Sequence, residues 1–188
     1  MAVSIALLSM AEFARLPQPG SGLRQELHHG EVVELPPVKK IHTKLQKTLV
    51  TLLESALRAS RSATDYVVDK EFPFRPLPEY EVWVADVAVF SRMVWEQTPD
   101  DEYFHGVPDL VIEVLSPSNT ASEMLDREEI CLSNGGREFW LVDPQRNAVR
   151  VMRAGGSWSV HDIPGRLESV VLGRSIAVRD IFGLCENP

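Results

Sequence analysis

The stretches VWVADVAVF at residues 82–90 and LVIEVL at residues 110–115 decide the fold. Both are almost entirely apolar, whereas a strand with one face in water alternates polar and apolar residues. Continuous apolar runs of this length predict strands that are covered on both faces. We therefore expect an α/β fold in which helices flank a largely internal sheet.

Helix signals lie on either side of these strands. Apolar residues recur at three- and four-residue steps over Val38–Ala59, which is the spacing of an amphipathic helix. Thr120-Ala121-Ser122-Glu123 has the spacing of a capping box and predicts a helix over Ala121–Asn134, ending before Gly135-Gly136. A short helix is also expected at Met10–Leu16.

Further strands are expected from alternating or apolar runs at Gly30–Leu35, Tyr66–Phe74, Arg137–Val142, Ala148–Arg153 and Trp158–Asp162. Gly155-Gly156 lies between the last two and predicts a hairpin. Thr98–Pro108 is polar and is expected to form a surface loop. The tail to Phe182 predicts a short strand and a helical turn.

The composition indicates one globular domain over residues 1–188, because the chain is 44% hydrophobic and has no repeat or low-complexity tract. Cys131 and Cys185 lie far apart and outside a CxxC pattern, which disfavours a zinc site or a disulfide framework and fits the reducing cytoplasm. No apolar run approaches the roughly 20 residues of a membrane-spanning helix. A membrane role is not expected.

The charge balance is acidic, with a net charge of -8. Proteins that bind nucleic acid usually carry clustered lysine and arginine side chains. All five lysines fall within residues 39–70. After Lys70 the chain has arginines but no lysine. Any DNA-binding face must therefore be local, or be supplied by a dimer or a partner.

Each of the two apolar runs, residues 82–90 and 110–115, carries one carboxylate in its interior. It is Asp86 in the first run and Glu113 in the second. An ionised carboxylate in an apolar setting is costly unless it is paired, hydrogen-bonded or bound to a metal. Two such side chains on neighbouring strands can share one divalent cation, and their oxygen atoms suit Mg²⁺ or Mn²⁺. The alternative is that each carboxylate pairs with an arginine or caps a loop.

Other polar residues are weaker candidates. Asp109 shares a strand face with Glu113 but lies nearer the strand start, where a turn role fits better than a ligand role. For His42, at the start of the first long helix, a polar helix-end role is the simpler interpretation. For Glu31 and Glu34, on the first expected strand, a surface position is the simpler interpretation.

The order of several motifs resembles the Uma-type family of bacterial restriction endonucleases from about Met10 to Phe182. The motifs are GEVVELPP at 30–37, His42, VADV at 84–87, PDLVIEVLSPS at 108–118 and EFWLVDP at 138–144. The most specific part is EVLSPS followed at the family's distance by EFWLVDP. The resemblance implies the restriction-endonuclease-like PD-(D/E)XK fold, a central mixed β-sheet flanked by helices with the active site at a strand pair.

In that superfamily an Asp and a Glu hold a divalent metal that polarises the scissile phosphate and makes hydroxide available, while a lysine positions the water. By position, the resemblance assigns the two metal-binding roles to Asp86 and Glu113. It also relates Glu31 to an acidic residue that precedes the first helix and joins the metal shell.

The chain departs from the family pattern at the lysine. Arg127 stands at the position where the family's lysine comes from the helix after EVLSPS, and Cys131 stands where a tyrosine is usual. Arginine can hold phosphate, but its pKa above about 12 excludes it as a base. The alternatives are a surface salt bridge between Arg127 and Glu123, four residues earlier, and a role for Lys70 in place of the family's lysine.

The resemblance therefore implies a metal-dependent DNA endonuclease with the catalytic residues Asp86, Glu113, Arg127 and Glu31. Cleavage of both DNA strands makes a homodimer attractive. The alternative is a catalytically weakened nuclease-fold module that binds DNA or a protein partner, which Arg127 and the acidic balance favour. Hydrolysis of another phosphate-containing substrate is a third hypothesis, because a fold does not fix a function.

Overall fold

The computed structural model describes residues 7–17, 19–20, 23–60, 64–117 and 119–184. The helices are α1 (Met10–Phe13), α2 (Lys40–Arg58), α3 (Arg92–Gln97), α4 (Ala121–Ser133) and α5 (Val178–Ile181). The strands are β1 (Arg24–His28), β2 (Glu31–Leu35), β3 (Tyr66–Arg75), β4 (Trp83–Ser91), β5 (Phe104–His105), β6 (Leu110–Val114), β7 (Glu138–Asp143), β8 (Ala148–Arg153), β9 (Trp158–Asp162), β10 (Arg166–Ser169) and β11 (Arg174–Ala177). Cys185, and Ser118 of the EVLSPS motif, lie outside the described residues.

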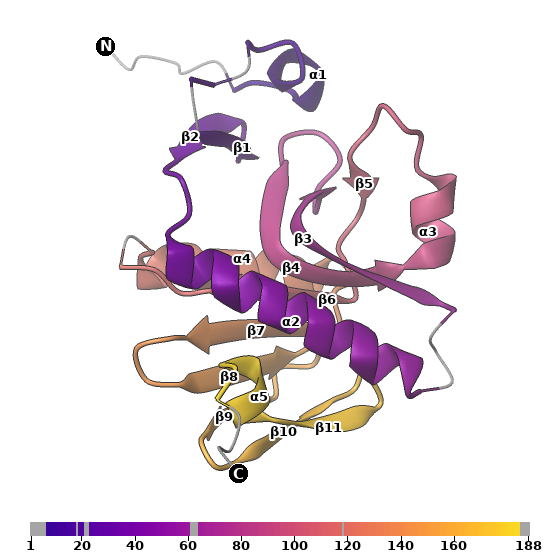
Figure 1. The fold of residues 1–188 in the computed structure, drawn as a ribbon. Helices are drawn as coiled ribbons and strands as arrows, with labels where there is room; N and C mark the ends of the chain where they lie inside the picture. Colours follow the sequence, from indigo (N-terminus) through magenta and orange to yellow (C-terminus); the bar gives the residue numbers. More distant parts are fainter. Residues whose placement is uncertain (1–6, 18, 21–22, 61–63, 118, 185–188) are drawn as a thin grey trace.

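A mixed seven-stranded sheet forms the centre of the molecule, in the strand order β5-β3-β4-β6-β7-β8-β9. Strands β4 and β6 run antiparallel, and β6 and β7 run parallel. Helix α2 crosses one face of the sheet and α4 lies on the opposite face (Figure 1). The pairs β1-β2 and β10-β11 complete the fold. The expected α/β fold, a mixed sheet flanked by helices, is confirmed.

Each face of the sheet is covered by its own hydrophobic core. In β6, Leu110, Ile112 and Val114 belong to the core beneath α2, whereas Val111 belongs to the core beneath α4. The buried face of α2, which includes Leu49, fills the first of these cores. Both sets of alternating positions are therefore buried, which explains the continuous apolar run in the sequence.

Most elements lie where the sequence predicts them. The helix expected over Val38–Ala59 is α2, and Thr120 and Glu123 form the capping box that begins α4. The expected surface loop Thr98–Pro108 is wrong in one part, because Phe104 is buried and β5 pairs with β3 there. Strand β1 and helix α3 have no counterpart among the predicted elements.

Among the described residues, no helix combines the length and the apolar character needed to cross a membrane.

The pairing of β4 with β6 brings the two predicted carboxylates to the same level of the sheet. Val87 pairs with Ile112, and Ala88 pairs with Val111. One further step of this antiparallel register places Asp86 opposite Glu113, at the end of the paired segment.

Candidate active site

Four charged side chains meet at this end of the β4-β6 pairing, and each comes from a different element. Glu26 lies on β1, Asp86 on β4, Glu113 on β6 and Arg127 on α4. Their exposed fractions are 0%, 4%, 9% and 7%, in that order. Charged groups are almost never this buried unless partners compensate for the lost hydration. These residues are called the four-charge cluster below.

Arg127 links three parts of the cluster. Its Nη1 donates to Oε1 of Glu113 at 2.7 Å, and its Nη2 donates to Oε2 of Glu26. The guanidinium also lies over the ring of Trp83, 5.1 Å from the ring centroid, which is a cation–π contact. Arg127 reaches inward because it lies on the buried face of α4, one turn before Cys131.

Asp86 contacts the opposite helix. Its Oδ2 accepts the backbone N–H of Val114 at 2.8 Å, and its Oδ1 accepts from Nε2 of Gln46 on α2 at 3.1 Å. Nε2 of His42 lies 2.7 Å from the same Oδ1, although the pair lacks the alignment of a hydrogen bond. Asp86 is therefore held from the α2 side, and Glu113 is held from the α4 side.

Two residues of the cluster, Glu113 and Arg127, have shifted pKa values. Burial raises the pKa of Glu113 from 4.5 to about 8; Arg127 opposes this rise, and the negative charges of Asp86 and Glu26 add to it. Burial alone would lower the pKa of Arg127, but Glu113 and Glu26 raise it above its ordinary value. The guanidinium thus stays charged, and the carboxyl of Glu113 keeps its proton near neutral pH.

The oxygen atoms of the cluster fit a hard divalent cation. Gln46 is fully buried, and its Oε1 has no hydrogen-bond partner within the described part of the chain. A buried amide oxygen without a partner costs free energy, and a metal ion is one way to satisfy it. Gln46, Asp86 and Glu113 carry oxygen atoms, which are the ligand type that Mg²⁺ prefers.

The protein does not supply a complete coordination shell by itself. Over the described ranges, no three His, Cys, Asp or Glu side chains are grouped so that they could hold a metal ion. Mg²⁺ commonly keeps several waters and binds through one or two carboxylates. The cluster is thus compatible with an open site whose remaining ligands are water and substrate.

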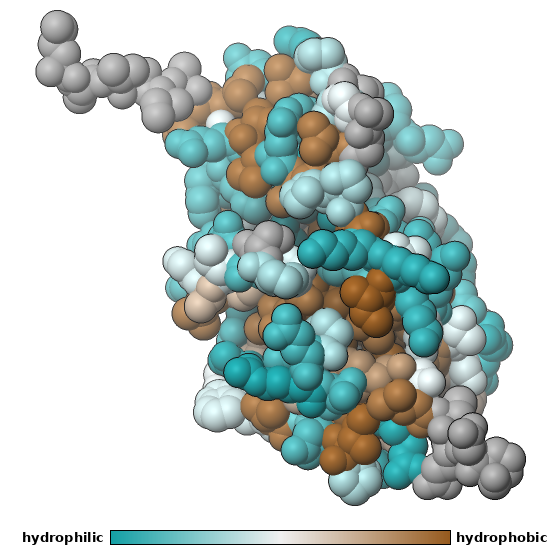
Figure 2. Space-filling view, turned by 60° about the vertical axis from the view of Figure 1, so that its left-hand side comes forward, coloured by the Kyte–Doolittle hydropathy of each residue, from teal (hydrophilic) through white to brown (hydrophobic). Residues whose placement is uncertain are grey.

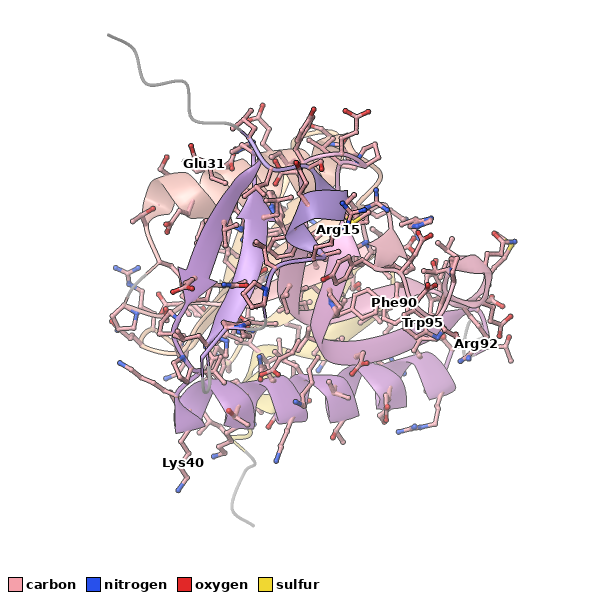
Figure 3. All side chains as sticks on the ribbon, turned by 90° about the horizontal axis from the view of Figure 1, so that it is seen from above. Arg15, Glu31, Lys40, Phe90, Arg92 and Trp95 are labelled. Carbon is pink, nitrogen blue, oxygen red and sulfur yellow. The ribbon has the colours of Figure 1, made fainter. Side chains whose placement is uncertain are left out.

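The structure brings together three of the four residues that the resemblance assigns to the site, Asp86, Glu113 and Arg127. It does not bring Glu31 to them. Glu31 is exposed at the start of β2, where it pairs with His28, and Figure 3 shows it at the edge of the molecule. Glu26, and not Glu31, is the acidic residue of the β1-β2 hairpin that is buried in the cluster.

The arrangement of the β1-β2 hairpin explains why Glu26 lies in the cluster and Glu31 does not. Strand β1 is the inner strand, because Leu27 and Val82 exchange two backbone hydrogen bonds of 2.8 and 2.9 Å. Glu26, beside Leu27, accepts the backbone N–H of Val84 at 3.1 Å and so lies against the start of β4. Strand β2 is the outer strand, and the side chain of Glu31 is exposed.

The other candidates take different positions. Arg127 does not form the alternative surface salt bridge, since Glu123 accepts the backbone N–H of Thr120 in the capping box at 2.8 Å. The carbonyl oxygen of Asp109 accepts two backbone N–H groups of the turn before β7, in line with a turn role. Among the described hydrogen bonds, none joins the side chain of Lys70 to the cluster.

Comparisons with known proteins agree with the observed fold. The family model "Uma2: Putative restriction endonuclease" matches residues 10–179 of the chain. A solved structure, described as a "putative nuclease belonging to DUF820" from Anabaena variabilis, matches with a TM-score of 0.77 and 21% sequence identity. The match covers 94% of this chain and 98% of that chain, which shows that the two share a fold. No curated protein matches the chain.

Proposed function

The chain belongs to the Uma2 family of restriction-endonuclease-like proteins, and on this premise we propose that it hydrolyses phosphodiester bonds of DNA with the aid of a divalent metal ion. The substrate class follows from the family, and the metal follows from the chemistry of the buried oxygen atoms. We also propose a homodimer, because cleavage of both strands of duplex DNA needs two sites.

The buried pair of Asp86 and Glu113 carries this proposal. They stand opposite each other on adjacent strands, and both are at least nine-tenths buried. The negative charge of Asp86 raises the pKa of Glu113, and thus adds to the cost of ionising Glu113. A divalent cation between them would remove this cost, so the arrangement is explained by cation binding better than by stability.

The residues have separate parts in the proposed reaction. Mg²⁺ or Mn²⁺ held by Asp86 and Glu113 would polarise the scissile phosphate and lower the pKa of a bound water. Oε1 of Gln46, whose amide donates to Asp86, would be a further oxygen ligand for this ion. Arg127 is a fixed positive charge that offsets the negative charge developing on the phosphate. It does not accept a proton, because it stays charged at any ordinary pH.

A second function is favoured by Arg127 itself. Its guanidinium already pairs with both Glu26 and Glu113, so the cluster can persist without a metal. In that case the chain is a nuclease-fold module that binds DNA or a protein partner and does not cleave. We further propose a cytoplasmic location for either function, in keeping with the unpaired thiol of Cys131.

Cleavage of supercoiled plasmid in the presence of Mn²⁺ tests the proposal. We expect the wild type to cut the plasmid and Asp86→Ala to reduce the rate about 100- to 1,000-fold. Asp109→Asn is the matched control and should cut like the wild type, since Asp109 lies in a turn outside the cluster. Arg127→Lys restores the family's lysine and should raise the rate about tenfold, because an ammonium is not equivalent to a planar guanidinium.

Two results would contradict the endonuclease proposal. Cutting that survives Asp86→Ala would show that Asp86 has no part in the reaction. A complete lack of cutting by the wild type and by Arg127→Lys, with DNA binding retained, would favour the binding module instead.

A further inference from the structure

Four of the five lysines of the chain lie along the first half of α2. Lys39 directly precedes the helix, and Lys40, Lys44 and Lys47 follow at four- and three-residue steps, which places them on one stripe of the helix surface. All four side chains are exposed. Figure 3 shows Lys40 pointing away from the body of the molecule. These residues are called the lysine stripe below.

The lysine stripe has no counter-charges of its own. No acidic residue occurs between Glu34 and Glu54 in a chain whose net charge is -8. Within the described part of the chain, no ion pair involves a lysine of the stripe. At the other end of the same helix, Arg58 pairs with Glu54 at 3.4 Å. The stripe is therefore a local positive surface on an acidic protein.

The lysines weaken the helix that carries them. Like charges three and four residues apart repel each other, and a positive charge in the first turn opposes the helix dipole. Helix α4 follows the stabilising pattern, with a capping box and Glu123 in its first turn. Helix α2 has no acidic residue in its first turn, and Lys39 makes no capping hydrogen bond. A segment that departs from local stability rules without a packing gain is a candidate for function.

We propose that the lysine stripe binds the phosphate backbone of duplex DNA along the outer face of α2, an inference that rests on the proposed function. A helix rises about 1.5 Å per residue, so Lys40 to Lys47 span about 10 Å along α2. One strand of B-DNA presents a phosphate about every 3.4 Å along its axis, or about three over that length. Exposed ammonium groups bind phosphates as point charges without reading bases.

The same helix connects the stripe to the four-charge cluster. His42, two residues after Lys40, and Gln46 contact Asp86 from the inward face of α2. The side of the molecule on which α2 begins carries many hydrophilic side chains between smaller hydrophobic patches (Figure 2). The start of α2 thus presents phosphate-binding charge on its outer face and supports the carboxylates on its inner face.

A salt titration of DNA binding tests this inference. Binding of a fluorescent duplex would be followed by anisotropy in EDTA, so that no cleavage occurs, from about 50 to 200 mM NaCl. The variant carries Lys40→Gln, Lys44→Gln and Lys47→Gln together. We expect its plot of log K against log [salt] to be shallower than that of the wild type by about 2.7, or about 0.9 for each lost contact. Arg58→Gln, on the same helix but paired with Glu54, is the matched control and should leave the slope unchanged.

The outcomes separate this inference from the proposed function. A triple variant that binds DNA with the slope of the wild type overturns the inference and leaves the proposed function standing. A wild type that binds no DNA overturns both. Thermal unfolding excludes a folding defect as the cause, because removing exposed repelling charges should leave the melting temperature equal or higher.

Discussion

Glu113 on β6 and Glu138 on β7 are buried carboxylates on neighbouring parallel strands, but the protein surrounds them differently. Oε1 of Glu138 accepts from Nε of Arg153 at 3.2 Å and from the backbone N–H of Val170 at 3.0 Å. Its Oε2 accepts from the hydroxyl of Ser169 at 2.5 Å. Every oxygen of Glu138 has a partner from the protein, and these partners join the β7-β8 pair to the chain around β10.

The surroundings of Glu113 are less complete. Among the described residues, Arg127 is the one that donates a hydrogen bond to the carboxylate of Glu113. Burial raises the pKa of Glu113 to about 8. Nearby, Oε1 of Gln46 is buried without a partner in the described structure, although its amide donates to Asp86. Glu113 and Glu138 are thus both buried in their strands, and they differ in the unmet bonding capacity beside Glu113, which the proposed function assigns to cation binding.

Replacing each glutamate by glutamine sharpens this comparison most strongly. Glu138→Gln should lower the free energy of unfolding by about 2–3 kcal/mol, because an amide N–H₂ would face donors where a carboxylate now accepts. Glu113→Gln should change it by less than about 1 kcal/mol, because the amide oxygen can still accept from Arg127. Urea denaturation at about pH 5, where the buried carboxyl of Glu113 keeps its proton, measures both values. Equal losses in the two variants would remove the distinction between the two sites.

The pH dependence of stability gives a second effect of similar size. An unfolded Glu113 carboxyl loses its proton near pH 4.5, and the buried one near pH 8, so folding between these values requires uptake of a proton. The stability of the metal-free wild type should therefore fall as pH rises from 5 to 8, and Glu113→Gln, which has no such proton, should gain about 3 kcal/mol relative to it. Urea denaturation at several pH values measures this difference. A difference that stays constant with pH would show that the carboxyl is not buried in solution as described.

Substitutions of Gln46 should have the smallest of these effects, a change in the affinity for Mn²⁺. Gln46→Met keeps the size of the side chain and removes the partnerless oxygen, so it should weaken Mn²⁺ binding about tenfold while leaving the fold intact. Gln46→Glu supplies an anionic oxygen at the same position and should bind Mn²⁺ at least as tightly as the wild type. Calorimetric titration compares the two variants. If both bind Mn²⁺ like the wild type, Gln46 has no role near the ion.

Much of the fold could be predicted from the sequence, because burial on both faces leaves a direct trace in composition. The runs that became β4 and β6 are apolar at every position that faces a core, with Asp86 and Glu113 as the exceptions. Helix α2 shows its period, and α4 shows its capping box, in the order of residues alone. These signals are local, so one sequence is enough to detect them.

The rest of the site depends on contacts between distant segments. Glu26 lies in RQELH, a polar strand with no periodic pattern, and it is buried because Leu27 pairs with Val82 far along the chain. Gln46 falls on the buried face of an amphipathic helix, where its polar character is the one local sign of a role. The inward turn of Arg127 toward Glu26 likewise needs the hairpin to be in place. Glu31 is the more obvious acidic residue in the sequence, but the outer strand carries it away from the site.

Cation binding by Asp86 and Glu113 is the property on which the proposed function depends most directly. Isothermal titration of the wild type with Mn²⁺ at pH 8 should show a binding site that is lost in Asp86→Asn and in Glu113→Gln. Glu138→Gln, the matched buried carboxylate on the next strand, should bind Mn²⁺ like the wild type. Absence of binding by the folded wild type, or binding that survives both Asp86→Asn and Glu113→Gln, would contradict the account.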